Sequence, residues 1–282
     1  MKFPQKFKSK KARSRIFLLL TIIIPIFVTV VLTLPKERVN QVIHITHIEP
    51  TKNLIPLGSP AFDQEFNTSS DLKAWSIVSQ SWPYSNELQY YSKENVYIRD
   101  GKLMIEADHT PYNGKDYISG RIDTKGHFEF TYGTVVIRAK LPAGKGIFPA
   151  LWLKPVEGPV YPEIDMMEYI GSKKNNAYAT FHAAPTGTYK RVGVTAIMPF
   201  NLSHSYHTYI LVWKKNDLTW YIDGQQIFHI TKFVPNEPMY LTINNAVGGM
   251  AGIPTKETQF PAFLKIDYVH IYTSNVSKDN LI

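Results

Sequence analysis

Apolar and polar residues alternate in short runs along most of the chain, from about residue 59 to residue 274. Apolar residues occupy every second position of 135–141, and the runs 209–213 and 218–222 flank an Asn-Asp turn at 216–217. Because successive side chains of a strand point to opposite faces, this alternation predicts many short strands. No convincing amphipathic helix interrupts them.

Many short strands separated by turn residues predict an all-β fold, a two-sheet antiparallel sandwich. We expect a single domain over 59–274, since sandwiches of roughly 200–250 residues are commonly one domain. No internal repeat with a period of about 20–50 residues is visible in the 282-residue chain, which disfavours a propeller.

Residues 16–34 follow a different pattern, an apolar run of 19 residues without a charge. A helix of this length rises about 28 Å, close to the hydrocarbon thickness of a bilayer. The tail 1–15 holds seven Lys/Arg residues and no acid, so it should stay cytoplasmic while the rest is exported. We expect a transmembrane signal anchor. The alternative is a cleaved signal peptide, although the run is long for one and no small-residue cleavage site follows it.

The flanks of the domain complete the predicted organisation. Residues 35–58 contain Pro35, Pro50 and Pro56 among polar and β-branched residues, and we interpret them as a linker. Residues 275–282 are interpreted as a C-terminal tail. The domain is therefore expected outside the cytoplasm, either membrane-anchored or secreted if the N-terminal segment is cleaved.

Charge and composition exclude several classes of function. The net charge of +8 arises in the basic tail, because the remaining chain has 24 basic and 23 acidic residues. A nearly neutral domain gives no support for a nucleic-acid partner. The chain has no cysteine, which excludes disulfides and thiolate metal sites. Aromatic residues make up 13% and suit both pleated sheets and stacking on sugar rings.

The most informative segment is 161–170, which reads Tyr-Pro-Glu-Ile-Asp-Met-Met-Glu-Tyr-Ile. In a strand, Glu163 and Asp165 share a face, whereas Glu168 has the wrong parity. Glu168 joins the acidic face only if one extra residue is absorbed near Met166 and Met167 by a β-bulge. Bulges are common beside active sites, where they re-aim a side chain.

The spacing of these acids suits glycoside hydrolysis. Five strand steps span about 16 Å, or about 13 Å once a bulge absorbs one residue. Two glutamates leaning together could bring their carboxyls to roughly 5–5.5 Å, the separation found in retaining glycosidases. Glu163 would then be the nucleophile, Glu168 the general acid/base, and Asp165 would hold Glu163 in place. Mutual repulsion would keep one carboxyl protonated near neutral pH.

Two other interpretations of the acidic segment stay open on spacing alone. Three acids in six residues also fit a solvent-exposed strand edge, although the flanking apolar residues indicate a central strand. Three carboxylates could instead bind Ca²⁺ or Mg²⁺. Cation-binding loops, however, usually alternate acids with Gly and Asn, and this segment has the pattern of a strand.

The segment resembles the E-x-D-x-x-E signature of glycoside hydrolase family 16, in its laminarinase-like branch with a β-bulge. Other segments resemble the family in the same order along about 60–273; they are 86–91, 119–122, 132–133, 138–142, 144–146, 149–152, 180–182, 220–224, 244–249 and 267–272. The resemblance implies a β-jelly-roll sandwich with a substrate cleft on its concave face. It also implies endo-hydrolysis of β-1,3- or β-1,3-1,4-glucan with retention. We expect a monomer that needs no cofactor for the chemistry.

By this motif match, Glu163 is the nucleophile, Asp165 its helper and Glu168 the acid/base. The resemblance adds residues expected to bind the polysaccharide; they are Asn86, Arg121, Phe148, Trp152, Tyr161, His182 and Asn244. Taken alone, a single histidine is more often structural, Asn86 fits a loop cap, and Arg121 fits a surface charge.

The resemblance further implies a structural Ca²⁺ on the convex face. The matching positions are Glu65, the carbonyl of Gly101, and Asp267, and oxygen ligands suit this ion. The alternative is that Asp267 is an outward-facing polar residue of an alternating strand.

Three departures from the family concern aromatic residues. Phe148 and Tyr161 stand where the family often has tryptophan, and Met250-Ala251 replace a third one. Phe148 and Tyr161 can still stack on a sugar, whereas Met250 can only pack. The departures therefore bear on substrate preference rather than on chemistry. The alternatives are a glucan transglycosylase and a non-catalytic glucan-binding module, and the retained Glu163 and Glu168 argue against the module.

Overall fold

The structure is a computed structural model, and it describes residues 38–46, 58–158, 160–185 and 187–273. The predicted basic tail, apolar segment and C-terminal tail lie outside this part of the chain, as do residues 47–57 of the predicted linker. Within the described ranges, no helix has the length and apolar character needed to cross a membrane.

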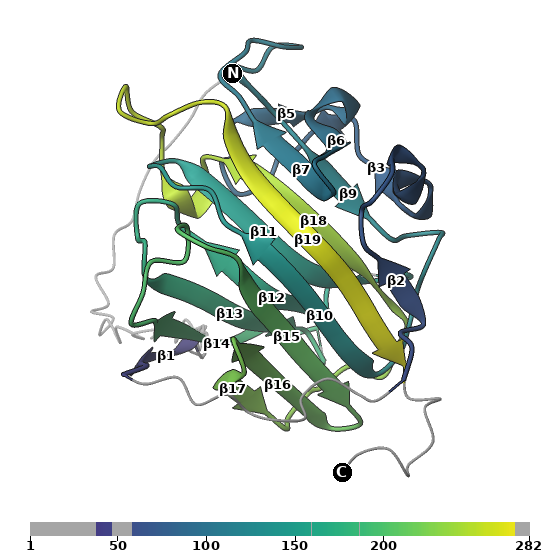
Figure 1. Ribbon diagram of the computed structural model, residues 1–282. Coiled ribbons are helices and arrows are strands. Elements are labelled where there is room, and N and C mark those ends of the chain that lie inside the picture. The colour runs from purple at the N-terminus through teal and green to yellow at the C-terminus, as the bar shows by residue number, and fades with distance from the viewer. Residues whose placement is uncertain (1–37, 47–57, 159, 186, 274–282) are drawn as a thin grey trace, which may run out of the picture. The chain divides into compact units, whose positions relative to one another are not determined.

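Two eight-stranded sheets face each other, which confirms the predicted two-sheet sandwich (Figure 1). The first sheet has the order β1 (Arg38–His44), β14 (Lys190–Ile197), β13 (Asn176–Ala183), β12 (Glu163–Tyr169), β11 (Ile147–Pro155), β18 (Met239–Val247), β9 (Arg121–Asp123) and β3 (Ser76–Ile77).

The second sheet has the order β17 (Gln225–Ile230), β16 (Asp217–Ile222), β15 (His207–Lys214), β10 (Gly133–Lys140), β19 (Ala262–Thr273), β7 (Lys102–Ala107) and β6 (Val96–Arg99), and β2 (Phe62–Gln64) also pairs with β19. A small third sheet consists of β4 (Gln80–Ser81), β5 (Gln89–Tyr91) and β8 (Tyr117–Ser119). The 3-10 helices are η1 (Ser69–Ala74), η2 (Lys93–Asn95) and η3 (Gly249–Ala251). Strand pairs are antiparallel except β1 with β14 and β5 with β8.

The core lies between the two large sheets and takes alternate residues from each strand. Leu151 of β11 and Ile164 and Met167 of β12 are fully buried and share one apolar cluster with Trp213 and Trp220 of the second sheet. Burying a side chain of this size contributes about 1.5–3 kcal/mol. Since alternate residues point the other way, the outer face of the first sheet carries the remaining side chains of β9, β11, β12, β13 and β18.

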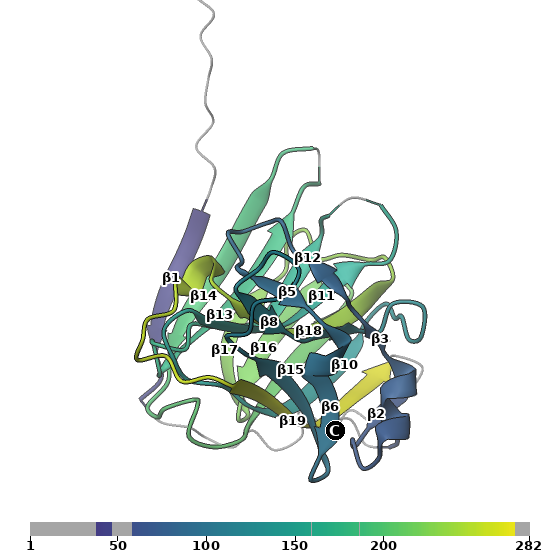
Figure 2. The ribbon, with the colours of Figure 1, turned by 90° about the horizontal axis from the view of Figure 1, so that it is seen from above.

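The linker prediction is wrong for residues 38–44, which form β1 at the edge of the first sheet, beside β14 (Figure 2). The strand runs parallel to β14 from Arg38 opposite Arg191 to His44 opposite Ile197. The stretch carries β-branched residues that suit a strand, and Ile43 packs against the core. Pairing here also covers an otherwise open edge of β14.

Candidate active site

A β-bulge interrupts β12 in the middle of the acidic segment. On the β11 side, Asp165 lies opposite Trp152 and Met167 opposite Leu151, which leaves Met166 as the extra residue. Both methionines are buried in the core, at 3% and 0% exposure. The bulge therefore restores the parity of Glu168, as the sequence pattern predicts, and brings it to the face that carries Glu163.

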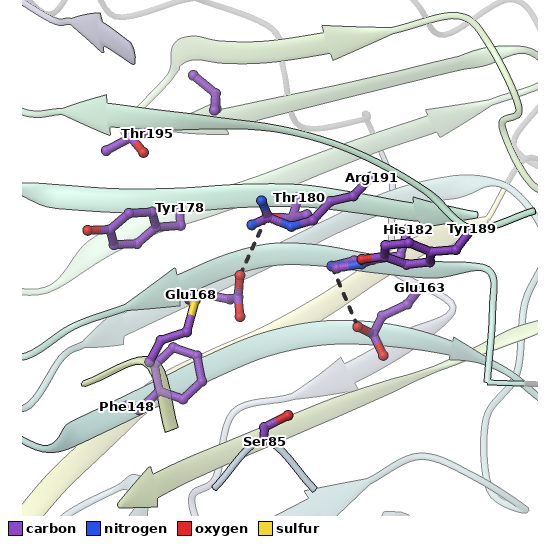
Figure 3. A pocket seen from close by; sticks show the side chains of 12 residues that line it. Ser85, Phe148, Glu163, Glu168, Tyr178, Thr180, His182, Tyr189, Arg191 and Thr195 are labelled. Atoms are coloured by element: carbon purple, nitrogen blue, oxygen red, sulfur yellow. Dashed lines mark hydrogen bonds and ion pairs between the residues drawn. The ribbon is translucent and has the colours of Figure 1, made fainter. Parts of the chain in front are cut away.

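Two adjoining cavities on this face form what we call the cleft. Their volumes are about 460 Å³ and about 700 Å³, and both are lined by Ser85, Phe148, Glu163 and Glu168. Figure 3 shows the side chains of Glu163 and Glu168 projecting from β12 into the smaller cavity. The predicted nucleophile and acid/base thus lie where the two cavities meet.

His182 of β13 lies opposite Glu163 and orders the carboxylates. Its Nε2 is 3.0 Å from Asp165 Oδ2 and 3.8 Å from Glu163 Oε1, while its Nδ1 is 2.7 Å from the hydroxyl of Tyr189. The imidazole is therefore held from both sides, and it links the helper Asp165 to the edge of the cleft.

The bulge itself is tied to the second sheet. The indole Nε1 of Trp220 donates to the backbone carbonyl of Asp165 at 3.0 Å, and Trp220 is fully buried. A side chain of β16 thus fixes the backbone of β12 between the two glutamates.

Glu168 has a different set of neighbours. The hydroxyl of Thr180 donates to Glu168 Oε2 over a long 3.5 Å, and Arg191 donates to the same Thr180 oxygen at 3.3 Å. The carboxyl of Glu168 therefore receives one weak hydrogen bond from the described residues, and burial is the largest influence on its pKa.

Burial raises the pKa values of all three carboxyls. The pKa of Glu163 rises to about 7 through burial and repulsion by Asp165, and burial raises that of Asp165 to about 7. Burial and the charge of Asp165 raise the pKa of Glu168 well above its ordinary value. Burial lowers the pKa of His182. Interacting carboxyls lose their protons in steps that belong to the set, so the set can hold an ionised and a protonated member at the same time. That division is what a nucleophile and an acid/base require.

The structure brings most of the predicted sugar-binding residues to the cleft. The larger cavity is lined by Arg121, Phe148, Trp152, Tyr161 and Asn244, and the smaller one by Phe148 and His182. The indole Nε1 of Trp152 donates to Asn244 Oδ1 at 2.7 Å, which fixes the orientation of that ring.

Asn86 is the predicted binding residue that lines neither cavity. It has a positive φ of 57°, and its carbonyl accepts from the backbone N–H of Gly249 at 3.2 Å. Its observed contact is thus that of a turn residue, while its neighbours Ser85 and Glu87 line the larger cavity.

Several cleft residues were absent from the sequence prediction; they are Trp82, Tyr84, Glu87, Lys154, Tyr189 and Arg191. The place of Lys154 in the cleft had a usable signal in the sequence, since it stands two positions after Trp152 in the same strand and so shares its face. Trp82 had none, because it reaches the cleft from a segment between short strands.

The three positions matched to a Ca²⁺ site already contact basic side chains of the protein. The ammonium of Lys102 contacts the Gly101 carbonyl at 3.0 Å and Asp267 Oδ1 at 2.7 Å, and Arg138 contacts the other oxygen of Asp267. The third matched residue, Glu65, instead contacts His270 Nε2 at 2.6 Å. This donor set does not fit Ca²⁺, because Lys102 occupies the position between two of the expected oxygen ligands.

Two groups in the described residues bring metal-ligating atoms within 4.8 Å of one another, Asp63 with Glu65 and His270, and Glu163 with Asp165 and His182. The second group is the hydrogen-bonded set already described. The third carboxylate of the metal interpretation, Glu168, does not belong to it.

The chain is similar to characterised glucanases. Glucan endo-1,3-beta-glucosidase A1 of Niallia circulans is 32% identical over 84% of this chain and 41% of that protein. The beta-glucanase of Rhodothermus marinus is 33% identical over 75% of this chain and 84% of that protein. The chain spans about half the length of several relatives that it matches, with shares of 41%, 52% and 44%.

The fold is similar to solved laminarinase structures. The laminarinase catalytic domain of Thermotoga maritima MSB8 superposes with a TM-score of 0.71 at 33% identity, over 76% of this chain and 98% of that one. This likeness confirms the jelly-roll form of the sandwich. The profile of glycosyl hydrolases family 16 matches residues 84–270, which includes the whole acidic segment and the cleft residues from Tyr84 onward. The chain belongs to glycosyl hydrolases family 16.

Proposed function

We propose that the chain is an endo-acting β-glucanase that hydrolyses β-1,3- or mixed β-1,3-1,4-glucan by double displacement, with retention at the anomeric carbon. The observation that carries this proposal is the bulge of β12. It brings Glu163 and Glu168 to the wall that both cavities share, so a sugar chain that crosses from one cavity to the other passes both carboxyls.

In the first step, Glu163 attacks the anomeric carbon while Glu168 donates its proton to the departing glycosidic oxygen. The bond between that carbon and the oxygen breaks, and a glycosyl ester with Glu163 forms. In the second step, Glu168 takes a proton from a water molecule. The water oxygen attacks the anomeric carbon and releases Glu163. These steps need no cofactor.

Asp165 and His182 position the nucleophile in this mechanism. Asp165 is 4% exposed and hydrogen-bonds His182, which also lies 3.8 Å from Glu163. The buried pair of Asp165 and His182 can therefore respond to a change in the charge of Glu163 by shifting the proton that the two residues share. Such a pair stabilises the nucleophile before attack and the leaving carboxylate afterwards.

Glucan as the substrate class is supported by the relatives and by the cleft. A related laminarinase of Zobellia galactanivorans, 31% identical, was crystallised with laminaritriose and laminaritetraose. In this chain, Trp82, Trp152 and Tyr161 line the larger cavity and offer faces for sugar rings.

We further propose that the domain acts outside the cytoplasm, anchored by residues 16–34 or secreted after their cleavage. The basic tail and the uncharged 19-residue run support this orientation. Carbonate extraction of membranes from the native host tests it: an anchored protein stays in the pellet at full length. A shortened, soluble protein favours cleavage, and a soluble full-length protein in the cytoplasm contradicts the proposal.

Release of reducing sugar from laminarin and mixed-linkage glucan tests the activity. The wild type should release oligosaccharides, Glu163→Gln should not, and Glu257→Gln, the same change at an exposed site, should match the wild type. Binding of glucan without turnover would instead indicate a binding module. Products longer than the starting oligosaccharide would indicate a transglycosylase.

A further inference from the structure

Two cationic side chains meet at the end of the cleft that lies beyond Trp152. Arg121 projects from β9 and Lys154 from β11, and both line the larger cavity. The guanidinium carbon of Arg121 lies 4.6 Å from the ring centroid of Trp82 and 5.1 Å from that of Trp152. The ammonium of Lys154 lies 5.7 Å and 5.3 Å from the same two centroids. Two positive charges therefore flank one pair of indoles.

Among the described residues, neither charge has an anionic partner at contact distance. Within the part of the chain that the structure describes, no ion pair involves Arg121 or Lys154. Arg121 is only 5% exposed, and its Nε is buried without a hydrogen-bond acceptor. A buried donor without a partner destabilises the fold, more so when it is charged. Such a group is retained where a ligand supplies the acceptor.

The surrounding carboxylates act on these cations only through space. Burial lowers the pKa of Lys154, against the opposing influence of Glu163 and Asp123. Asp123, next on the same face of β9, binds the backbone N–H of Lys125 at 3.2 Å. Glu87 receives hydrogen bonds from Gln89 and Tyr91 at 2.6 Å and 3.0 Å. Asp123 and Glu87 are thus hydrogen-bonded to other groups, and Glu163 acts on Lys154 only from beyond contact distance.

Contact with the two indoles does not by itself account for the presence of two cations, Arg121 and Lys154, at this place. A cation over an aromatic ring is stabilised only modestly. An unpaired, desolvated charge costs more than this. A neutral sugar hydroxyl could accept one hydrogen bond, but it would leave both cations without an anion in contact. An anion at this position would satisfy the donors and the charges together.

We propose that this end of the cleft binds an anionic substituent, a carboxylate or sulfate carried by a sugar ring that lies against Trp82 and Trp152. The preferred substrate is then an acidic β-glycan rather than plain glucan, an inference that rests on the proposed glycan-cleaving cleft. Arg121 presents a planar set of donors, and Lys154 adds a mobile point charge. Ring stacking and charge recognition therefore act on one sugar unit.

The test measures binding rather than turnover, so that it does not depend on hydrolysis. All proteins carry Glu168→Gln, which prevents cleavage and keeps the charge of Glu163. Three oligosaccharides of equal length serve as probes in calorimetry: a β-1,3-glucan, its 6-carboxylated form and its 6-sulfated form. Lys154→Met removes the charge, Lys154→Arg keeps it, and Lys215→Met removes an exposed lysine charge of the β15–β16 turn.

With lysine at 154, at least one anionic probe should bind about tenfold or more tightly than the neutral one, as expected for a charge-assisted contact. Lys154→Met should weaken binding of the anionic probes far more than binding of the neutral probe, and an unchanged melting curve shows that the variant is folded. Lys154→Arg and Lys215→Met should keep the preference. Added salt should weaken it only where the charge at 154 is present.

Equal or tighter binding of the neutral probe overturns the inference, as does an equal loss for all probes in Lys154→Met. Preference for carboxylate over sulfate, or the reverse, identifies the substituent. Hydrolysis of laminarin without anionic preference leaves the proposed function intact and removes only this inference. If the protein prefers the anionic probes through Lys154 but the unmutated enzyme hydrolyses none of them, this inference stands and the proposed function fails.

Discussion

The indole N–H of Trp220 donates to the backbone carbonyl of Asp165 at 3.0 Å, although the two residues belong to strands of different sheets. The acceptor lies at the bulge that gives Glu168 its orientation. One buried hydrogen bond across the sandwich therefore connects the packing of the core to the geometry of the cleft.

Replacing Trp220 with phenylalanine should affect both stability and catalysis. Loss of the donor leaves a buried carbonyl without this partner, which lowers the free energy of unfolding by about 1–3 kcal/mol. Because that carbonyl lies between the glutamates, kcat on laminarin should also fall, by about tenfold or more for a displacement near 1 Å. Thermal melts and initial rates measure the two effects.

Trp213→Phe provides the matched control. Trp213 is equally buried, and its Nε1 donates at 3.1 Å to the carbonyl of Pro235, away from the cleft. This variant should lose similar stability and keep the wild-type kcat. If both variants lower kcat equally, the link between Trp220 and the bulge has no special role in catalysis.

The pH dependence of kcat/KM should show an acidic limb near pH 7. Glu163 must be ionised to attack, and burial together with Asp165 raises its pKa to about 7. His182 lowers the pKa of Glu163, so His182→Asn should shift the limb to higher pH. A limb near pH 4.5, the ordinary range of a glutamate, would contradict the described environment.

Stability should depend on pH in the direction opposite to that of most carboxylates. The folded-state pKa of Glu163, about 7, exceeds its ordinary value of 4.5, so the folded protein binds this proton more tightly than the unfolded chain does. Its ionisation therefore destabilises the fold as pH rises from about 4.5 to 7, and the loss is complete above pH 7. Glu163→Gln should stabilise the protein at pH 8 by about 1–3 kcal/mol and have little effect at pH 4. Urea unfolding at the two pH values measures this difference; equal stability of the two proteins at pH 8 would count against it.

Chelation of divalent ions should leave the melting temperature unchanged. Lys102 contacts both the Gly101 carbonyl and Asp267, where the resemblance implied Ca²⁺. Melting curves with EDTA and with millimolar Ca²⁺ should coincide, and Lys102→Met should lower the free energy of unfolding by up to about 1 kcal/mol. A drop of several degrees in EDTA would show that an ion binds despite Lys102.

The alternation and spacing of residues along the chain predicted the features of the fold and the site that depend on the geometry of a single strand. Alternation predicted the strands, and the parity of Glu163, Asp165 and Glu168 required the bulge that β12 contains. The resemblance predicted that His182 belongs to the substrate cleft, and the structure places it opposite Glu163.

Features that depend on pairing between distant strands were not predictable in this way. The Lys102 contact with Asp267 depends on how β7 aligns with β19. The meeting of Arg121 and Lys154 requires that β9 and β11 flank β18. Prolines around 38–44 favoured a linker, and the strand that forms there depends on pairing with the distant strand β14.

The stereochemistry of the first product tests the central claim most directly. Proton NMR during hydrolysis of a reduced laminari-oligosaccharide distinguishes the anomers before they interconvert. Double displacement by Glu163 and Glu168 predicts that the β-anomer appears first and that the α-anomer follows by mutarotation. An α-anomer formed first, or no cleavage by the wild type, would contradict the account.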